Sequence, residues 1–437
     1  LASQAGVHET YGGVVPRLAQ EAHKAAIDST VTEALRRSGV SPAQLTAVAV
    51  TVGPGLSMCL EVGVKKAVEL SSVHQLPLVR VHHMEAHAMV SWLPAAAAVA
   101  APPDAAAPSA PSAPADAATP PTPPAQPTAV RSTVSTPSVA AASSAAAARE
   151  LSPTGVPPFP FLTLLVSGGH NMLVLSAGLG DHTILGSTLD DSIGEAFDKT
   201  ARLLGITKVP GGPPLEQLAR SGDSRRHALP RPLSKTRDNS LRTSCDFSYA
   251  GLKSAVRQLL ETKLPLAKRE LLSEEDLQQE LAHVAASFQR VAVEHLVERT
   301  ARALGWAREA HPSLSCLVVA GGVAANQEVR RQLTRVASEA GLPMVCPPVR
   351  LCTDNGIMVA WTGMQRLRHG LADRPVSTSQ DVSLFVEVRP RWPLGPRDPR
   401  STTQQAQLSK RKRAPSAGQP TGGDPEKSGS KQQKDGA

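Results

Sequence analysis

The sequence predicts an α/β protein, because runs with the character of strands alternate with segments that have helical patterns. Residues 46–52 and 161–166 are apolar runs rich in β-branched or large aliphatic side chains, and both have the length of a buried strand. Residues 316–320 form a third run of this kind. Each run ends in a glycine-containing turn, which favours strands buried within one or more sheets.

The elements before the first long turn follow in order. A helix is expected to begin near Pro16, since proline is favoured in the first turn of a helix. Apolar residues then recur at helical spacing, and Gly39 follows as a stop signal. After the strand at 46–52, residues 53–55 form a tight turn into a second helix, and residues 77–81 form another short strand.

Two histidines stand out in the segment after that strand. On a helix, His83 and His87 would point about 40° apart around the axis, one turn above the other. Two imidazoles in this arrangement can bind one metal ion, although surface or core histidines can show the same spacing. Asp354 offers a third ligand, and two histidines with one carboxylate leave coordination positions open for a substrate. Glu85 would point away from the face that carries both histidines. In the H-E-x-x-H pattern of zinc proteases the glutamate directly follows the first histidine, whereas here it comes one residue later.

Composition separates two segments from the rest. Sixteen of the 38 prolines fall between residues 94 and 160, among Ala, Ser and Thr, so residues 94–158 are expected to be a disordered insertion. Residues 396–437 hold nine Lys/Arg against four Asp/Glu and are expected to be a disordered basic tail. The five cysteines include no C-x-x-C pair, which favours reduced thiols. No apolar run reaches the roughly 18 residues that span a bilayer.

Glycine turns suggest a nucleotide site. The strand at 161–166 stops in Ser167-Gly168-Gly169-His170, and the strand at 316–320 is followed by residues 321–326 and a helix. A strand, a turn of small residues and a helix N-terminus can together receive a phosphate, although a plain tight turn has the same sequence. The basic stretch from Arg225 to Arg257 can contact a nucleic-acid backbone or form a solvated loop.

A set of motifs in a fixed order points to one family. The motifs are His83-Met84-Glu85-Ala86-His87, Ser167-Gly168-Gly169-His170, Phe197-Asp198-Lys199-Thr200, Phe247-Ser248-Tyr249-Ala250-Gly251-Leu252-Lys253, Gly321-Gly322-Val323-Ala324-Ala325-Asn326 and Thr353-Asp354-Asn355. Together they resemble the tRNA N6-threonylcarbamoyladenosine transferases, formerly called O-sialoglycoprotein endopeptidases. The resemblance extends from Ala2 to Leu394 around the insertion, and residues 351–361 look most like the mitochondrial members of animals.

The resemblance implies a two-lobed, actin-like or sugar-kinase-like ATPase fold. The first lobe would comprise residues 1–93, completed by about 352–390, and the second lobe residues 159–351 with the nucleotide-binding turns. The family's first strand and its acidic N-terminal motif are missing before Leu1, so the first sheet is expected to lack a strand. Leu165 stands where some relatives carry a tyrosine that can touch the metal, so that ligand is expected to be absent.

The resemblance also implies an activity. The threonylcarbamoyl group would move from threonylcarbamoyl-adenylate to N6 of the adenosine next to the anticodon, in tRNAs that read codons beginning with A. His83, His87 and Asp354 would bind one divalent cation, which could be iron, zinc, magnesium or manganese. No catalytic residue separate from this metal site is expected. The residues that would contact the adenylate are Leu165, Val166, Ser167, Gly168, Gly169, Asp198, Gly212, Glu216, Ala325, Asn326 and Thr353.

The expected partners are tRNA and a separate synthase that supplies the adenylate, without a membrane, for a monomer or homodimer. A mitochondrial location is implied, although the sequence opens on Leu1-Ala2-Ser3 and contains no transit peptide. Two other functions stay open. A metallopeptidase would need a general base that Glu85 is badly placed to be, and a non-catalytic nucleotide-binding scaffold would need no metal chemistry.

Overall fold

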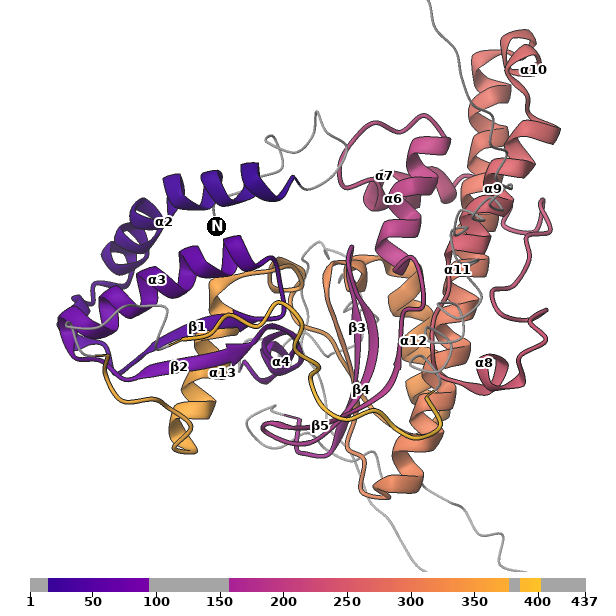
Figure 1. The fold of residues 1–437 in the computed structure, drawn as a ribbon. Coiled ribbons are helices and arrows are strands. Elements are labelled where there is room, and N and C mark those ends of the chain that lie inside the picture. Colours follow the sequence, from indigo (N-terminus) through magenta and orange to yellow (C-terminus); the bar gives the residue numbers. More distant parts are fainter. Residues whose placement is uncertain (1–14, 94–156, 377–385, 402–437) are drawn as a thin grey trace, which may run out of the picture.

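The computed structural model describes residues 15–93, 157–376 and 386–401 (Figure 1). These residues form two α/β parts, each built on its own sheet, with helix α4 (His83–Met89) between them. The predicted α/β class is therefore confirmed. The insertion predicted at residues 94–158 lies outside the described residues except for its last two, and the tail lies outside them beyond residue 401.

The first part is a parallel pair of strands covered by helices on both faces. Its elements are α2 (Pro16–Ser38), a 3-10 turn (Pro42–Gln44), β1 (Val48–Gly53), α3 (Ser57–His74), β2 (Leu78–His82) and α13 (Gly356–Arg368). Val50 shares a buried cluster with Val64 of α3, whereas Val79 and Val81 share one with Met358 of α13. Residues 356–368 therefore pack on the first sheet, which supports the proposal that about 352–390 complete the first lobe.

Sequence signals place the first helix accurately. α2 begins at Pro16, and its C-cap Gly39 has φ +67, a left-handed conformation that glycine adopts without steric cost. Both boundaries are those expected from the sequence.

One edge of β1 has no strand beside it among the described residues. Among the described strands, β1 pairs with β2 alone. A groove of ≈ 940 Å³ runs along this edge, lined by residues of α3 such as Leu60 and of α13 such as Met364. Ala49 and Thr51, expected in a buried strand, are consequently only half-buried. The expectation that the first sheet lacks a strand stays a prediction.

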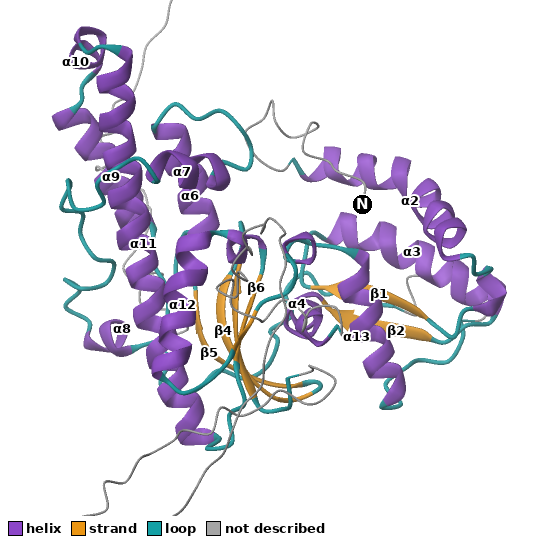
Figure 2. Cartoon of the chain, turned by 180° about the vertical axis from the view of Figure 1, so that it is seen from behind, coloured by secondary structure: helices purple, strands orange, loops and turns teal. Residues whose placement is uncertain are grey.

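The second part is a mixed five-stranded sheet in the order β5-β4-β3-β6-β7. Its strands are β3 (Phe161–Val166), β4 (Asn171–Gly178), β5 (Asp181–Ser187), β6 (Leu317–Ala320) and β7 (Met344–Val345). β3 is antiparallel to β4 and parallel to β6. The helices are α6 (Ile193–Leu203), α7 (Gly212–Ala219), α8 (Asn239–Thr243), α9 (Ala250–Lys263), α10 (Leu266–Leu271), α11 (Glu274–Ala310) and α12 (Gln327–Glu339). They lie on the side of this sheet that faces away from the first part (Figure 2).

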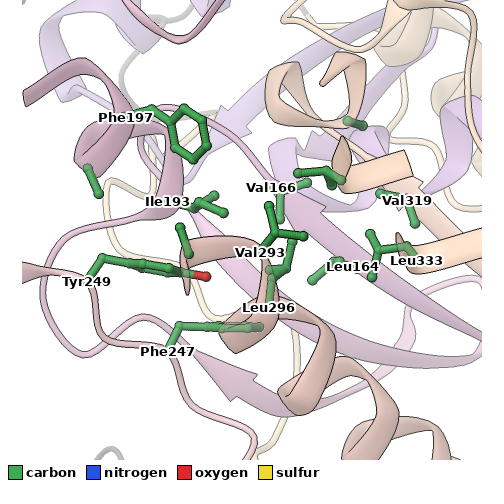
Figure 3. Close-up of a cluster of buried hydrophobic side chains, with 14 of the residues drawn as sticks. Leu164, Val166, Ile193, Phe197, Phe247, Tyr249, Val293, Leu296, Val319 and Leu333 are labelled. Carbon is green, nitrogen blue, oxygen red and sulfur yellow. The ribbon is translucent and has the colours of Figure 1, made fainter. Parts of the chain in front are cut away.

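The main core fills the space between this sheet and its helices (Figure 3). Leu164 and Val166 of β3 lie in one buried cluster with Val293 of α11 and Phe197 of α6. Each is at most 3% exposed. Burying a side chain of this kind contributes roughly 1.5–3 kcal/mol, so the second sheet is a rigid base for the turns at its edge.

The long helix α11 organises this core. Its N-cap Ser273 accepts a hydrogen bond from the backbone of Asp276, and the acidic first turn suits the positive end of the helix dipole. α11 has 37 residues, but like the other described helices it is not apolar over a stretch long enough to cross a bilayer.

Residues 386–401 form a strap over both parts. The backbone of Arg389 donates to the carbonyl of Val52 in β1. Further along, Ile184 of β5 donates to the carbonyl of Pro396, and Asp398 donates back to Ile184. The expectation that the disordered tail starts at residue 396 is therefore wrong for residues 396–401, because they add a bridge to the edge of the second sheet.

Candidate metal centre and nucleotide site

The two histidines of the site come from α4, which follows β2 directly. The ring of His82 caps this helix, because its Nδ1 accepts a hydrogen bond from the backbone of Met84 at 3.1 Å. His83 and His87 lie on successive turns with ring centroids 4.7 Å apart. The helical spacing predicted from the sequence is therefore present.

Asp354 reaches the same point from the other end of the chain. It lies between a 3-10 turn (Val349–Leu351) and α13, whose N-cap Asn355 accepts a hydrogen bond from the backbone of Met358 at 2.9 Å. The Oδ1 atom of Asp354 lies 2.9 Å from Nε2 of His87 and 3.6 Å from Nε2 of His83. The three candidate ligand atoms all lie within 4.8 Å of one another.

The protonation states suit a cation. Burial lowers the pKa of His83 to about 4, so its imidazole is neutral at pH 7. The hydrogen bond from His87 holds the pKa of Asp354 below its ordinary value, so this carboxyl is ionised. Nδ1 of His87 is buried and has no hydrogen-bond partner among the described residues. Two imidazole nitrogens and one carboxylate oxygen at these distances fit a divalent metal.

Glu85 faces away from this cluster, as its helical position predicts. Its side chain is 1% exposed and bonds to Gly180, His182 and Arg366. It is therefore not placed to activate a water molecule at the histidine pair, which argues against the metallopeptidase.

Sequence reasoning missed His170 as a neighbour of the cluster. Burial lowers its pKa, and the charge of nearby His87 lowers it further. The signal was present, since His170 directly follows the turn at residues 167–169 that was singled out for the nucleotide.

The first glycine turn lies in a β-hairpin. Residues 167–170 join the antiparallel strands β3 and β4, so the turn does not lead into a helix. Ser167 and His170 instead close a hairpin by a backbone hydrogen bond of 2.8 Å, which the sequence did not predict. The helix N-terminus comes from α6 instead: Ser192 donates to the carbonyl of Gly168 at 2.7 Å.

A close approach holds α6 against this turn. A Cβ atom at Gly194 would lie 2.6 Å from the carbonyl oxygen of Ser167, so only glycine fits there. Gly168 and Gly169 themselves are exposed, with open space around them. Their backbone is therefore accessible to a ligand.

The two strand residues before the turn have buried side chains. Leu165 packs in a small apolar cluster with Met84 of α4, and Val166 belongs to the main core. Neither side chain is directed to solvent, so a ligand would meet these residues through their backbone. Leu165 has no polar side-chain atom, and the absence of a fourth protein ligand at this position stays a prediction.

The second glycine turn has the expected form. β6 leads into a 3-10 turn (Gly322–Ala325), and the side chain of Asn326 caps α12 by accepting from the backbone of Val329 at 2.9 Å. Gly321 has φ +104, and a Cβ atom there would collide with the carbonyl of Val166. This glycine therefore brings the two turns together.

Two acidic residues connect the remaining predicted positions. Asp198 accepts a hydrogen bond from the backbone of Gly211 at 2.8 Å, which fixes the turn before Gly212. Glu216 of α7 accepts one from the backbone of Gln327 at 3.0 Å, which fixes α7 against the start of α12. Both residues are expected to contact the adenylate, and one oxygen of each carboxylate already accepts a hydrogen bond from the protein.

Thr353 joins the two sites. A Cβ atom at Gly322 would lie 3.6 Å from Cγ2 of Thr353. Thr353 is exposed and precedes the candidate ligand Asp354. The metal cluster and the second glycine turn are therefore adjacent through two consecutive residues.

Two α/β parts with a polar site between their sheets define a two-lobed protein of the actin-like ATPase type. The chain belongs to the tRNA N6-adenosine threonylcarbamoyltransferase (TsaD) family, whose profile matches residues 1–110 and 132–361. It is 42% identical over 398 residues to the probable mitochondrial tRNA N6-adenosine threonylcarbamoyltransferase of Arabidopsis thaliana, covering 90% of this chain and 69% of that protein.

Bacterial relatives carry the same name, tRNA N6-adenosine threonylcarbamoyltransferase. The tRNA N6-adenosine threonylcarbamoyltransferase of Methylobacterium sp. (strain 4-46) is 37% identical over 392 residues, covering 90% of this chain and 88% of that protein. The protein of the same name from Brucella ovis is 36% identical over 394 residues, covering 90% and 86%. The predicted family is confirmed. The mitochondrial relative is a plant protein, and the expected likeness to animal members stays a prediction.

Proposed function

We propose that this protein transfers the threonylcarbamoyl group from threonylcarbamoyl-adenylate to N6 of the adenosine next to the anticodon in tRNAs that read codons beginning with A. The observation that carries this proposal is that two consecutive residues, Thr353 and Asp354, belong to the two neighbouring sites. The candidate ligand Asp354 directly follows Thr353, which lies against Gly322 of the second glycine turn, and this closeness supports a metal centre beside a nucleotide-binding turn. The names of the relatives support the same reaction.

The chain's own residues would hold the adenylate in two places. The exposed backbone of Gly168 and Gly169, next to the N-terminus of α6, would receive the phosphate. Residues of the second turn, with Asp198, Gly212 and Glu216, would surround the nucleoside, and Ala325, Asn326 and Thr353 would border it. In this arrangement the acyl carbonyl would be directed toward the histidine cluster.

The transfer forms a bond between the tRNA N6 amine and the acyl carbon, and it breaks the bond between that carbon and the phosphate of AMP. The amine loses one proton to solvent, and AMP leaves with the electron pair of the broken bond. His83, His87 and Asp354 would bind one divalent cation, which would polarise the carbonyl and neutralise charge on the leaving phosphate. Which of iron, zinc, magnesium or manganese is bound stays open. We expect no nucleophilic residue separate from this centre.

The proposed partners follow from this reaction. They are tRNA, and a separate synthase that makes the adenylate. The protein would act as a monomer or homodimer without contacting a membrane. A mitochondrial location is proposed from the name of the Arabidopsis relative.

The direct test combines the purified chain with threonylcarbamoyl-adenylate and an unmodified tRNA. Mass spectrometry of the digested nucleosides should reveal threonylcarbamoyladenosine at the position next to the anticodon. A folded, metal-loaded protein that produces none would contradict the proposal. In cells that lack the gene, unchanged threonylcarbamoyladenosine in mitochondrial tRNA would favour the scaffold, and metal-dependent cleavage of a sialoglycoprotein would favour the peptidase.

A further inference from the structure

Glu85 is a charged residue in an unusual place. It lies in α4 between His83 and His87, and its side chain is 1% exposed. Removing a carboxylate from water costs several kcal/mol unless charges and hydrogen bonds replace the water. The charges and hydrogen-bond donors around Glu85 therefore decide whether its carboxylate is stable in this buried position.

Three groups replace the water. Oε1 of Glu85 accepts a hydrogen bond from the backbone of Gly180 at 2.8 Å and one from Nε2 of His182 at 3.0 Å. Oε2 pairs with Nη1 of Arg366 at 2.7 Å. His182 is fixed in turn, because its Nδ1 lies 3.0 Å from Oγ of Ser176.

These partners belong to different parts of the molecule. Gly180 and His182 lie in the β4–β5 hairpin of the second sheet, whereas Arg366 lies in α13, which packs on the first sheet. α13 also begins two residues after Asp354. One carboxylate therefore connects the helix that carries both histidines to the second sheet and to the element that follows the aspartate.

α4 needs such an anchor. It has seven residues, and a helix of two turns has little stability of its own in water. Its rotation about its axis decides where both imidazoles point, and Glu85 lies on the opposite side from them. Fixing Glu85 on three sides therefore fixes the direction of His83 and His87.

We propose that Glu85, with His182 and Arg366, is a positioning residue that holds α4 so that His83 and His87 meet Asp354 at one cation. This rests on the metal centre of the proposed function and assigns Glu85 no contact with substrate. A buried ion pair of this kind adds little net stability compared with apolar residues of similar size. Its main effect is geometric.

The test measures metal binding without the transfer reaction. The full chain is freed of metal and titrated with Co²⁺ in competition with a chelating dye, and the visible absorption of bound Co²⁺ is recorded. Glu85→Gln keeps the size of the side chain but removes its charge. We expect the Kd for Co²⁺ to rise about tenfold to 100-fold, the range seen when groups that orient metal ligands are lost. The absorption bands should shift as the ligands lose their alignment.

Asp246 provides a matched control. It is also a buried carboxylate, 0% exposed, with a cationic partner in Arg397 and a backbone donor in Ser187. It lies on none of the elements that carry the candidate ligands. Asp246→Asn should lower the melting temperature as Glu85→Gln does, but it should leave the Kd for Co²⁺ and the spectrum unchanged.

Arg366→Lys keeps the positive charge and serves if Glu85→Gln does not fold. It should weaken Co²⁺ binding, because the flexible ammonium of lysine lacks the planar geometry of the guanidinium. The factor should be smaller than for Glu85→Gln, because the positive charge opposite Glu85 is kept. If the variants lose stability but bind Co²⁺ with the wild-type Kd and spectrum, this inference is overturned while the metal centre stands. If the wild-type chain itself binds no Co²⁺, the metal centre of the proposed function is overturned as well.

Discussion

His83 shows how burial prepares a residue for metal binding. Its side chain is 19% exposed, and burial lowers its pKa to about 4. A histidine must be unprotonated to act as a ligand, so this residue needs no deprotonation at neutral pH. The neighbouring carboxylate of Asp354 would supply negative charge to a cation bound there.

Replacing His83 should separate function from folding. His83→Ala removes one of three candidate ligands, so we expect transfer activity to fall by at least about 100-fold, since even groups that only orient ligands cost 10–100-fold. The melting temperature should change little, because the ring borders a polar site and is not part of the main core. Activity is measured by nucleoside mass spectrometry. His23→Ala on exposed α2 is the control, and full activity in His83→Ala would exclude the metal from the reaction.

His295 is a buried histidine with a structural role. It lies in α11, 3% exposed, against the rings of Phe247 and Tyr249. Its Nε2 accepts a hydrogen bond from the backbone of Ser248 at 3.3 Å. Burial lowers its pKa to about 3, and the nearby charges of Arg299 and Arg302 lower it further.

This histidine should make the fold sensitive to acid. In the unfolded chain it takes up a proton below its ordinary pKa of about 6.5, whereas in the folded protein it stays neutral down to about pH 3. Stability is therefore lost between pH 6.5 and 3, by about 1.4 kcal/mol at pH 5.5 relative to pH 8. His295→Gln should lack this contribution. The difference in free energy of unfolding between the variant and the wild type should therefore shift in favour of the variant by about 1.4 kcal/mol from pH 8 to pH 5.5. Urea unfolding at both pH values measures it, with exposed His23→Gln as control. A difference in free energy of unfolding between variant and wild type that is the same at both pH values would contradict this role of His295.

The N-terminus of α6 connects a helix to the first glycine turn. Ser192 accepts a hydrogen bond from the backbone of Glu195 at 3.2 Å as the N-cap, and its hydroxyl donates to the carbonyl of Gly168. One side chain thus starts the helix and fixes the turn.

Ser192→Ala should therefore affect both stability and substrate binding. Loss of an N-cap costs about 1 kcal/mol, and release of Gly168 should raise the KM for the adenylate. Ser273→Ala is a matched control, because Ser273 caps α11 and has no contact with the turn. Denaturant unfolding and steady-state kinetics are compared for the two variants. Equal KM values in both would show that the bond to Gly168 has no part in binding.

The strap at residues 386–401 couples the two parts of the molecule. Arg389 bonds to β1, and Arg397 forms an ion pair with Asp246 at 3.0 Å beside the second sheet. The side chain of Asp246 is 0% exposed, so this pair lies at the inner side of the strap.

Arg397→Met should destabilise the whole molecule. It leaves the buried carboxylate of Asp246 without its guanidinium, and removing one partner of a buried pair costs about 3–5 kcal/mol. The free energy of unfolding from urea denaturation measures this. The exposed pair of Arg36 with Glu33 is the control, since Arg36→Met should lower the free energy of unfolding far less than Arg397→Met does. Similar losses in both variants would mean that the strap adds nothing beyond a surface contact.

The sequence predicted local features well. The boundaries of α2, the strand at 161–166 and the direction of Glu85 on its helix depend on spacing and on residues such as Pro16 and Gly39. It did not predict that the turn at 167–170 closes a hairpin. Backbone pairing with β4 decides that. The apolar run before the turn would be the same whether a strand or a helix followed.

Spacing and residue chemistry alone determined the α/β class, the family motifs and the pairing of His83 with His87, because each follows from neighbours along one segment. The approach of Asp354 to these histidines was predicted from its residue type and from the resemblance, but no spacing could show it, because 267 positions separate Asp354 from His87. Tertiary structure decided that contact, and it decided the buried partners of Glu85. Contacts between distant segments depend on how the two sheets pack around α4, and no local pattern encodes that packing.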